Sequence, residues 1–305
     1  MSDRIEALTE ILPYVREFLG QTFVIKLGGE VCQPEVLNRI AEQVSLIHHM
    51  GIRVTLVHGG GPQIDDLLSR LAIEQRKIAG RRITDEQTLS AAKMVYNGLL
   101  SADIVAALRR HGAAAVGLSG ADAGLITATR RPPRQMEDAH GRSIEVDFGH
   151  VGDIAAISTR VVDLLTGDRM IPVVCSLAAD ESGNVLNVNA DTIAARIAVA
   201  LKAHKLIVMT NVPGVLRRRE DHASLISYTD TESLRMLIRE GAITDGMLPK
   251  VESCIEAVRQ GVPRTHIIDG NRPGALLLEL FLNEGCGTMI VNDAERRQYE
   301  EEMGR

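Results

Sequence analysis

Short apolar runs that end in glycine, each followed by a stretch with helical spacing, recur along this chain. Thr22–Leu27 is one such run and leads into Gly28 and Gly29; residues 53–57 form another and lead into glycines at 59–61. Strands that alternate with helices predict a mainly parallel sheet, because each crossover helix must cover one of its faces. The sequence therefore predicts an α/β fold, a three-layer αβα sandwich with a central, mainly parallel sheet.

The remaining pattern extends this fold to both ends of the chain. Residues 85–111 predict one long helix, and residues 125–153, where turn residues multiply, predict β-hairpins. Asp191 is expected to be the N-cap of a helix that runs to about residue 201. Near the N-terminus, apolar spacing predicts a helix that Pro13 should kink.

No linker rich in Pro or Ser divides the chain. We therefore expect one unit with two lobes, residues 21–180 and 181–305, that share a continuous sheet, preceded by the helix at residues 1–20. The length of 305 residues suits a single large α/β unit of this kind.

Composition excludes several classes of protein. The net charge of −6, the absence of Trp and a total of four Phe and four Tyr argue against a nucleic-acid surface, which needs basic clusters and stacking rings. No apolar run approaches the roughly 18 residues of a membrane span, and the charged start does not match a signal peptide. The four cysteines form no CxxC pair, which is typical of free thiols. We expect a cytoplasmic protein that binds neither nucleic acid nor membrane.

The two glycine clusters are candidate ligand loops. Glycine at the carboxyl end of a strand exposes backbone N–H groups, and the helix that follows adds partial positive charge, so phosphoryl oxygens fit there. Tight turns without a ligand are the alternative. The chain contains neither GxxxxGK[ST] nor GxGxxG, so the common nucleotide-binding loops do not apply.

Two lysines suggest charge neutralisation. Lys26 interrupts an otherwise apolar strand, so it is either an edge lysine with its amine in water or a cation aimed at a phosphoryl group. Lys250 follows Pro249 in the first turn of a predicted helix, where a cation opposes the helix dipole and needs an anionic partner. A solvated helix lysine is the alternative for Lys250.

Taken together, the motifs resemble the amino acid kinase family and, within it, the branch that phosphorylates N-acetyl-L-glutamate. The resemblance runs from about residue 22 to the C-terminus. The matching segments, in chain order, are residues 25–29, 57–62, 82–85, 149–153, 186–191, 210–215, 243–247 with Lys250, and 266–270.

The resemblance implies ATP-dependent phosphorylation of the γ-carboxylate of N-acetyl-L-glutamate, a step of arginine biosynthesis. Residues 21–180 would then bind the acylated amino acid and residues 181–305 would bind ATP. Mg²⁺ is expected to be held mainly by the phosphates and water, without a metal site in the protein.

The resemblance also implies roles for single residues. Lys26 and Lys250 would neutralise the transferring phosphoryl group, Gly29 and Gly60 would donate N–H bonds to it, and Asp191 would hold both lysines. The substrate would be bound by Gly60, Gly61, Arg82 (on the α-carboxylate) and Asn187 (on the acetamido group). The nucleotide would contact Thr210, Asn211, Gly214, Leu216, Asp245, Gly246, Met247 and Lys250.

The N-terminal helix resembles the extension of arginine-inhibited, hexameric members of the family. The resemblance implies L-arginine as an effector and a homo-oligomer between dimer and hexamer. A plain dimer contact without regulation is the alternative. The corresponding effector residues are Tyr14, Lys205, His266, Glu279 and Gly285, of which the glutamate and the lysine suit the guanidinium and the carboxylate of arginine.

Besides an unusual basic stretch at residues 130–134, which we expect to be a solvated loop, two residues depart from the family pattern near the expected ligands. Asn211 stands where Asp is usual, and Glu30 places a negative charge near the expected phosphates, which is unfavourable unless it points away. Two further functions therefore stay open: a kinase for a related, for example carrier-linked, amino-acid carboxylate, and a non-catalytic arginine sensor on the same fold.

Overall fold

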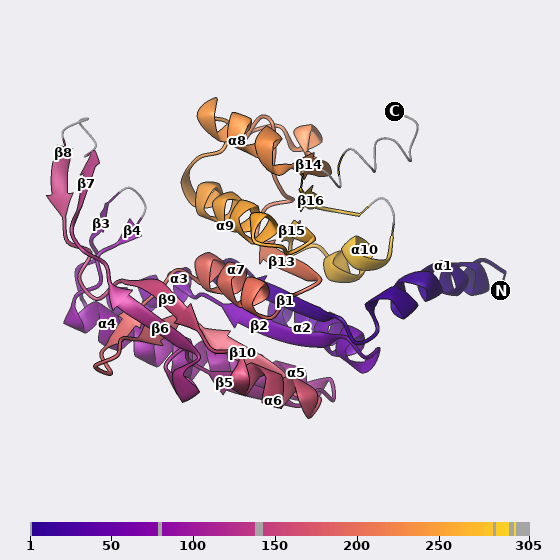
Figure 1. The fold of residues 1–305 in the computed structure, drawn as a ribbon, viewed down its shortest axis with the longest axis horizontal. Coiled ribbons are helices and arrows are strands. Elements are labelled where there is room, and N and C mark those ends of the chain that lie inside the picture. The colour runs from indigo at the N-terminus through magenta and orange to yellow at the C-terminus, as the bar shows by residue number, and fades with distance from the viewer. Residues whose placement is uncertain (1, 79–80, 138–142, 283–284, 293–295, 297–305) are drawn as a thin grey trace.

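The computed structural model describes residues 2–78, 81–137, 143–282, 285–292 and 296. Its centre is an eight-stranded sheet in the order β14–β16–β15–β13–β1–β2–β10–β5 (Figure 1). Within the described residues, every neighbouring pair is parallel except β15 with β16. The strands are β1 (Thr22–Leu27), β2 (Arg53–His58), β5 (Ala115–Leu118), β10 (Ile171–Cys175), β13 (Lys205–Thr210), β14 (Tyr228–Asp230), β15 (Arg264–Asp269) and β16 (Thr288–Val291).

Helices cover both faces of this sheet, so the predicted three-layer α/β fold is confirmed. The helices are α1 (Ser2–Phe18), α2 (Pro34–His49), α3 (Gly61–Arg70), α4 (Glu86–Lys93), α5 (Ser101–Arg110), α6 (Arg160–Gly167), α7 (Ala190–Ala200), α8 (Thr231–Arg239), α9 (Leu248–Arg259) and α10 (Ala275–Phe281).

Side chains of β1 alternate between the two cores. Phe23, Ile25 and Leu27 pack in the core that contains α2, α5 and α10, whereas Val24 packs in the core that contains α7 and α9. Because side chains of a strand repeat every two residues, Lys26 points to the same face as Val24, towards α7. The strand period thus decides which helix can meet this lysine.

The expected long helix over residues 85–111 is present, with one difference. Asp85 caps it by accepting a hydrogen bond from the Thr88 backbone N–H at 2.8 Å, and the run then continues through α4 and α5. Between them, η2 (Met94–Leu100) is a π-helix, which the apolar spacing did not predict. Such wide turns are frequent at functional sites.

The same run, Glu86–Arg110, has the length and mean hydropathy of a membrane span, and it alone does so within the described chain. Half of its apolar window is buried inside the molecule, against α2 and β5 among other elements. The core helix of a folded domain meets the same two criteria. Length and hydropathy therefore give no evidence that this helix spans a membrane.

Hairpins follow in the predicted region. A second sheet has the order β12–β11–β6–β9, and two small two-stranded sheets join β3 with β4 and β7 with β8. The predicted turn at residues 140–142 lies outside the described residues. The strands are β3 (Lys77–Ile78), β4 (Arg81–Arg82), β6 (Ile126–Arg130), β7 (Arg134–Glu137), β8 (Ser143–Val146), β9 (Gly152–Ile157), β11 (Leu177–Ala179) and β12 (Val185–Asn187).

Helix α1 projects from the end of the molecule opposite the β7–β8 hairpin (Figure 1). It is one helix with Pro13 inside it. Its last residue, Phe18, is buried, and its ring centroid lies 5.2 Å from that of Phe23 and 6.0 Å from that of Phe281. The helix is therefore anchored to the body through its C-terminal half, by this aromatic cluster and by Ile11 and Val15, which pack against the same core.

The main sheet runs through both predicted lobes. Residues 21–180 supply β1, β2, β10 and β5, and residues 181–305 supply β13, β15, β16 and β14. The pairing of β1 with β13 joins the two sets. The exact lobe boundaries stay a prediction.

Candidate active site

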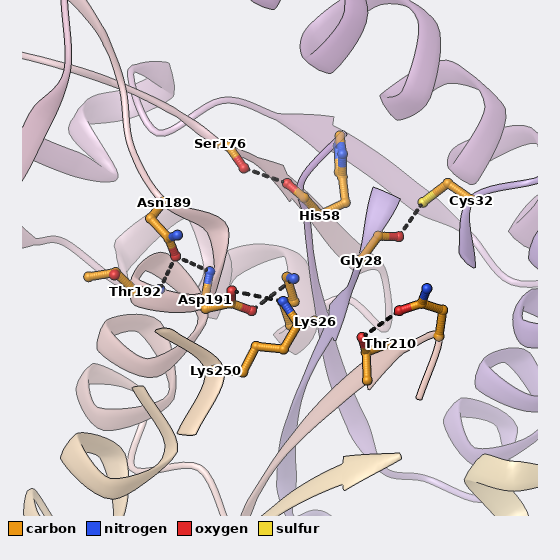
Figure 2. A network of polar contacts seen from close by, with 11 residues as sticks. Lys26, Gly28, Cys32, His58, Ser176, Asn189, Asp191, Thr192, Thr210 and Lys250 are labelled. Carbon is orange, nitrogen blue, oxygen red and sulfur yellow. Dashed lines mark hydrogen bonds and ion pairs between the residues drawn. The ribbon is translucent and has the colours of Figure 1, made fainter. Parts of the chain in front are cut away.

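Three charged side chains, two of them buried and that of Lys250 partly buried, meet at the carboxyl end of β1 (Figure 2). Lys26 is 4% exposed and Asp191 is 5% exposed. The Lys26 Nζ lies 2.8 Å from Asp191 Oδ1, and the Lys250 Nζ lies 3.4 Å from Asp191 Oδ2. The lysines come from β1 and α9, and the aspartate from α7, so three elements distant in sequence build one charge cluster.

The strand order excludes one alternative for Lys26. Because β1 pairs with β2 on one side and β13 on the other, Lys26 lies on an interior strand and is no edge lysine. Lys250 likewise has the anionic partner that its place in the first turn of α9 requires. Both lysines are therefore held in a fixed position by one carboxylate.

Electrostatics favour an ionised aspartate and a net positive cluster. Burial acts to raise the pKa of Asp191, but the charges of Lys26 and Lys250 act against it, and its pKa lies below the usual value. One carboxylate between two ammonium groups leaves a formal charge of +1 in a protected place. Such a place attracts an anion.

The N-cap of α7 differs from the prediction. Asn189, not Asp191, caps this helix, because its Oδ1 accepts hydrogen bonds from the backbone N–H groups of Asp191 at 2.8 Å and Thr192 at 3.1 Å (Figure 2). The prediction of Asp191 as the cap is therefore wrong. With Asn189 as the cap, the Asp191 carboxylate lies in the first turn and reaches the lysines.

The two glycine loops lie against each other beside this cluster. A Cβ placed on Gly29 would lie 2.7 Å from Pro62 Cδ and 3.0 Å from Gly60 Cα. A Cβ on Gly60 would lie 2.4 Å from Leu100 Cδ1, in the π-helix, and 2.9 Å from a ring carbon of Tyr96. Neither position has room for a side chain, so the close packing of the two loops requires glycine at both.

The residues expected to bind an acylated amino acid lie around the second loop. Arg82 Nη2 lies 2.6 Å from Asp65 Oδ1 and 3.4 Å from the carbonyl oxygen of Gly61. Its Nη1 is buried and has no hydrogen-bond partner among the described residues. Asn187 Nδ2 donates to Thr84 Oγ1 at 3.2 Å. An unsatisfied buried guanidinium nitrogen is a strong donor that awaits an acceptor.

Asp65 is a site residue that the sequence reasoning missed. Burial acts to raise its pKa, but hydrogen bonds from Lys77 and Arg82 outweigh this effect and lower the pKa. Asp65 therefore stays ionised and holds Arg82 from α3. The sequence did contain a signal for it: an acidic residue one turn into the helix that follows the second glycine loop.

An exposed ion pair links Arg219, just beyond the first segment expected to bind nucleotide, to the second such segment. The first, residues 210–216, follows β13, and the second contains η5 (Asp245–Met247). Arg219 Nη1 donates to Asp245 Oδ2 at 2.8 Å, and Asp245 adopts a positive φ of 48°. Gly214 has a φ of 150°, and a Cβ there would lie 2.5 Å from Thr288 Oγ1. Arg219 was not foreseen, because its partner is distant in sequence.

The two departures from the family pattern lie at the surface. Glu30, in η1 (Gly29–Val31), is exposed, so water screens its charge, but it does not point away from the first glycine loop: its Oε2 would lie 2.6 Å from a Cβ on Gly28. Asn211 is also exposed, and its Oδ1 accepts a hydrogen bond from Thr210 Oγ1 at 3.4 Å. Neither residue disrupts the buried charge cluster.

The residues expected to bind an effector form a second cluster at the other end of β13. Lys205, the first residue of β13, has its Nζ 3.4 Å from His266 Nε2, and His266 Nδ1 lies 2.8 Å from Glu279 Oε1. Burial lowers the pKa of His266 to about 4, so its ring is neutral near pH 7. A Cβ on Gly285 would lie 2.9 Å from Glu279 Oε2.

Helix α1 contacts this second cluster through its aromatic end. The Lys205 Nζ lies 5.2 Å from the ring centroid of Phe18, a cation–π distance, and the Tyr14 ring lies 6.1 Å from the same ring. Four of the five expected effector residues are thus in direct contact, and Tyr14 is connected to them through Phe18.

No metal centre is visible in the part of the chain that the structure describes. No group of three or more His, Cys, Asp or Glu side chains could hold an ion there. Both oxygens of Asp191, the carboxylate at the centre of the site, already face lysines.

The fold and the site together define a class of enzyme. A parallel sheet with glycine loops at its carboxyl edge, and two lysines held by one aspartate between them, is suited to phosphoryl transfer. The match to the amino acid kinase family spans residues 21–269, and the chain belongs to this family. It is a phosphotransferase.

Among the members of this family, the chain is similar to proteins named acetylglutamate kinase. A protein of Methanothrix thermoacetophila named acetylglutamate kinase is 41% identical over 288 residues, which is 94% of this chain and 98% of the relative. The acetylglutamate kinase of Desulfitobacterium hafniense is 43% identical over 289 residues, 94% of this chain and 97% of the relative.

Solved structures support the fold. N-acetylglutamate synthase from Neisseria gonorrhoeae, complexed with coenzyme A and N-acetyl-glutamate, is 25% identical with a TM-score of 0.81, and the match covers 98% of this chain and 70% of that one. Carbamate kinase from Giardia has a TM-score of 0.64 at 18% identity, over 90% of this chain and 99% of that one, and shows the fold alone.

Proposed function

We propose that this protein transfers the γ-phosphoryl group of ATP to the γ-carboxylate of N-acetyl-L-glutamate, in the biosynthesis of arginine. The observation that carries the proposal is the Lys26–Asp191–Lys250 cluster, centred on a buried aspartate, beside two touching glycine loops. The names of relatives that are 41–43% identical over nearly the whole chain support the choice of acyl substrate.

The chemistry needs no general base. A γ-carboxylate oxygen of the substrate attacks the γ-phosphorus of ATP and forms a P–O bond, while the bond to the β,γ-bridging oxygen breaks and ADP leaves. The product is an acyl phosphate. Because a carboxylate is already a nucleophile, catalysis consists of positioning and charge neutralisation.

Each part of the site has a role in this scheme. Lys26 and Lys250 neutralise the equatorial oxygens of the transferring group, and Asp191 keeps both amines in place. The backbone N–H groups of Gly29 and Gly60 donate to the same oxygens. The net charge of +1 at the cluster complements the transferring phosphoryl group, which stays negatively charged because no proton is transferred to it from the protein.

Arg82 orients the acyl substrate. Its unsatisfied Nη1 donates to the α-carboxylate, while Nη2 stays bonded to Asp65. A planar guanidinium is suited to a carboxylate. Asn187, with Gly60 and Gly61 nearby, binds the acetamido end of the substrate.

ATP binds between residues 210–216 and residues 245–250, and Arg219 pairs with the first residue of the second segment. Its contacts are those expected from the sequence: Thr210, Asn211, Gly214, Leu216, Asp245, Gly246, Met247 and Lys250. Mg²⁺ bound to the phosphates adds positive charge to them. The protein fits an ion held in this way, because the central carboxylate is already engaged by lysines.

L-arginine is the proposed effector. The Lys205–His266–Glu279 cluster offers a cation for its carboxylate and a buried carboxylate for its guanidinium, and helix α1 contacts the cluster through Phe18. In this proposal α1 also forms the contacts of a homo-oligomer between dimer and hexamer.

An assay of ADP release with N-acetyl-L-glutamate, with and without arginine, tests both proposals. We expect turnover that requires free acetylglutamate and that millimolar arginine inhibits. Absence of turnover would contradict the kinase and favour a carrier-linked substrate or a sensor. Turnover that arginine does not change would contradict the regulation, and light scattering reports the oligomeric state.

A further inference from the structure

Gln63, in the first turn of α3, reaches across to the other glycine loop. Its side-chain Nε2 donates to the carbonyl oxygen of Gly29 at 2.8 Å, over a sequence separation of 34 residues. Its Oε1 is buried without a hydrogen-bond partner among the described residues, and it would lie 2.8 Å from a Cβ on Gly29. The amide head therefore lies directly over Gly29.

The orientation of the amide follows from chemistry. A flipped amide would place Oε1 against the Gly29 carbonyl oxygen, and two acceptors repel each other. In the observed orientation Gln63 makes one hydrogen bond and leaves one acceptor buried, which is unfavourable on its own. The buried, unsatisfied Oε1 is a cost that formation of helix α3 alone does not explain.

The contact joins the two loops that are proposed to bind the phosphoryl group. Gly29 follows β1 and Gly60 follows β2, and both strands carry their loop to the same edge of the sheet. Pro62 and Gly60 already touch Gly29 on one side. At the base of the loops, the Gly59 backbone N–H donates to the carbonyl oxygen of Leu27 at 3.2 Å. Further out, the Gln63 hydrogen bond adds a directional side-chain link to Gly29, where the other contacts are van der Waals contacts with Pro62 and Gly60.

We propose that Gln63 is a positioning residue that fixes the spacing of the two glycine loops and thereby aims the N–H groups of Gly29 and Gly60 at one phosphoryl group. This inference rests on the proposed kinase function. Gln63 touches neither substrate nor reacting atoms in this scheme; it acts through the carbonyl group of Gly29.

The test compares Gln63→Met, which keeps the length of the side chain but removes the donor, with Gln63→Glu. For Gln63→Met we expect kcat to fall roughly 10- to 100-fold, because misplacement of a donor by about 1 Å has an effect of this size. The KM values for ATP and acetylglutamate should change less than about twofold, since ground-state contacts remain.

Gln63→Glu adds a readout that a merely structural role would not produce. A neutral carboxyl group can donate to the Gly29 carbonyl oxygen, whereas a carboxylate repels it. We therefore expect the activity of Gln63→Glu, relative to wild type at each pH, to rise as the pH falls. The relative activity of Gln63→Met should stay low at every pH.

Matched controls come from Gln260, an exposed residue at the end of α9 whose side chain bonds only to Glu256 within the described structure. Gln260→Met and Gln260→Glu should behave as wild type. Hydrogen exchange gives a second readout that needs no turnover: amides at residues 28–32 should exchange faster in Gln63→Met.

The results distinguish a failure of the positioning role of Gln63 from a failure of the proposed kinase function. Wild-type kcat in Gln63→Met, or equal pH profiles for the two Gln63 variants, overturns the positioning role while the kinase stands. A wild type without turnover overturns the kinase, and unchanged exchange at residues 28–32 then overturns the loop contact as well.

Discussion

Replacement of Asp191 by Asn removes the only negative charge between the buried ammonium group of Lys26 and the partly buried one of Lys250 within the described site. The side chain keeps its size and its place in α7, whose cap is Asn189. The change therefore isolates the charge. We expect Asp191→Asn to lower both the free energy of unfolding and kcat.

The magnitude follows from the two distances. At 2.8 Å and 3.4 Å, with an effective dielectric constant of about 20, the gross Coulomb energies are about 6 and about 5 kcal/mol. Desolvation of the three charges offsets most of this gain. Removal of the shared partner leaves two uncompensated charges, and such changes reduce stability by about 3–5 kcal/mol.

Lys250→Met is the matched comparison. It leaves Lys26 and Asp191 as a neutral pair and removes a cation that opposes the dipole of α9. We expect a loss of stability below about 1 kcal/mol, because no charge is left without a partner. Its kcat should nevertheless fall by about 10²- to 10³-fold, as expected when a group that stabilises the transition state is removed.

Stability is measured by urea unfolding, followed by far-UV circular dichroism because the chain has no Trp. The folded pKa of Asp191 is lowered, so its ionised form stabilises the protein fully above the unfolded value of about 3.9. This contribution is lost as the pH falls through the folded pKa. The gap between wild type and Asp191→Asn should therefore narrow below about pH 4.

Two results would refute this reasoning. One is an Asp191→Asn variant that is no less stable than Lys250→Met at neutral pH. The other is a stability gap that stays constant as the pH falls. Either result would show that Asp191 is not the counter-charge of the two lysines.

Three further changes test other parts of the site. Arg82→Lys loses the planar donor pair that Asp65 and the substrate share, so the KM for acetylglutamate should rise about tenfold or more while the KM for ATP stays unchanged in steady-state kinetics. Gly60→Ala places a Cβ 2.4 Å from Leu100 Cδ1, so unfolding should show a loss of about 1–3 kcal/mol together with a loss of kcat. Asn189→Ala removes the cap of α7 and should lower stability by about 1 kcal/mol in the same urea experiment; an unchanged midpoint would contradict that role.

Much of the fold could be predicted because its signals are local. The apolar run of β1 and the glycines that end it lie within eight neighbouring residues, and the predicted strand Thr22–Leu27 agrees with the observed one. The strand order, in contrast, needs contacts between distant segments. It was the position of β1 between β2 and β13 that decided between the two interpretations of Lys26.

The errors and omissions share one physical cause. Asn189 and Asp191 are both good capping residues; Asn189 caps α7, while the Asp191 carboxylate contacts Lys26 and Lys250 from other elements, which local sequence does not reveal. Gln63 was missed for the same reason, because its partner lies 34 residues away. The local sequence pattern indicates residues such as Lys26 and Lys250. The contacts that position them join segments that are distant in sequence, so the pattern cannot predict those contacts.

The pairing of β1 with β13 has a consequence for dissection of the enzyme. If the chain were cut between residues 180 and 181, one fragment would end its sheet at β1 and the other at β13. Each would expose the edge of a largely apolar strand with unpaired N–H and C=O groups, which is a template for aggregation. We therefore expect each half to aggregate when it is expressed alone. When both halves are expressed together, β1 and β13 can pair again, and activity should return.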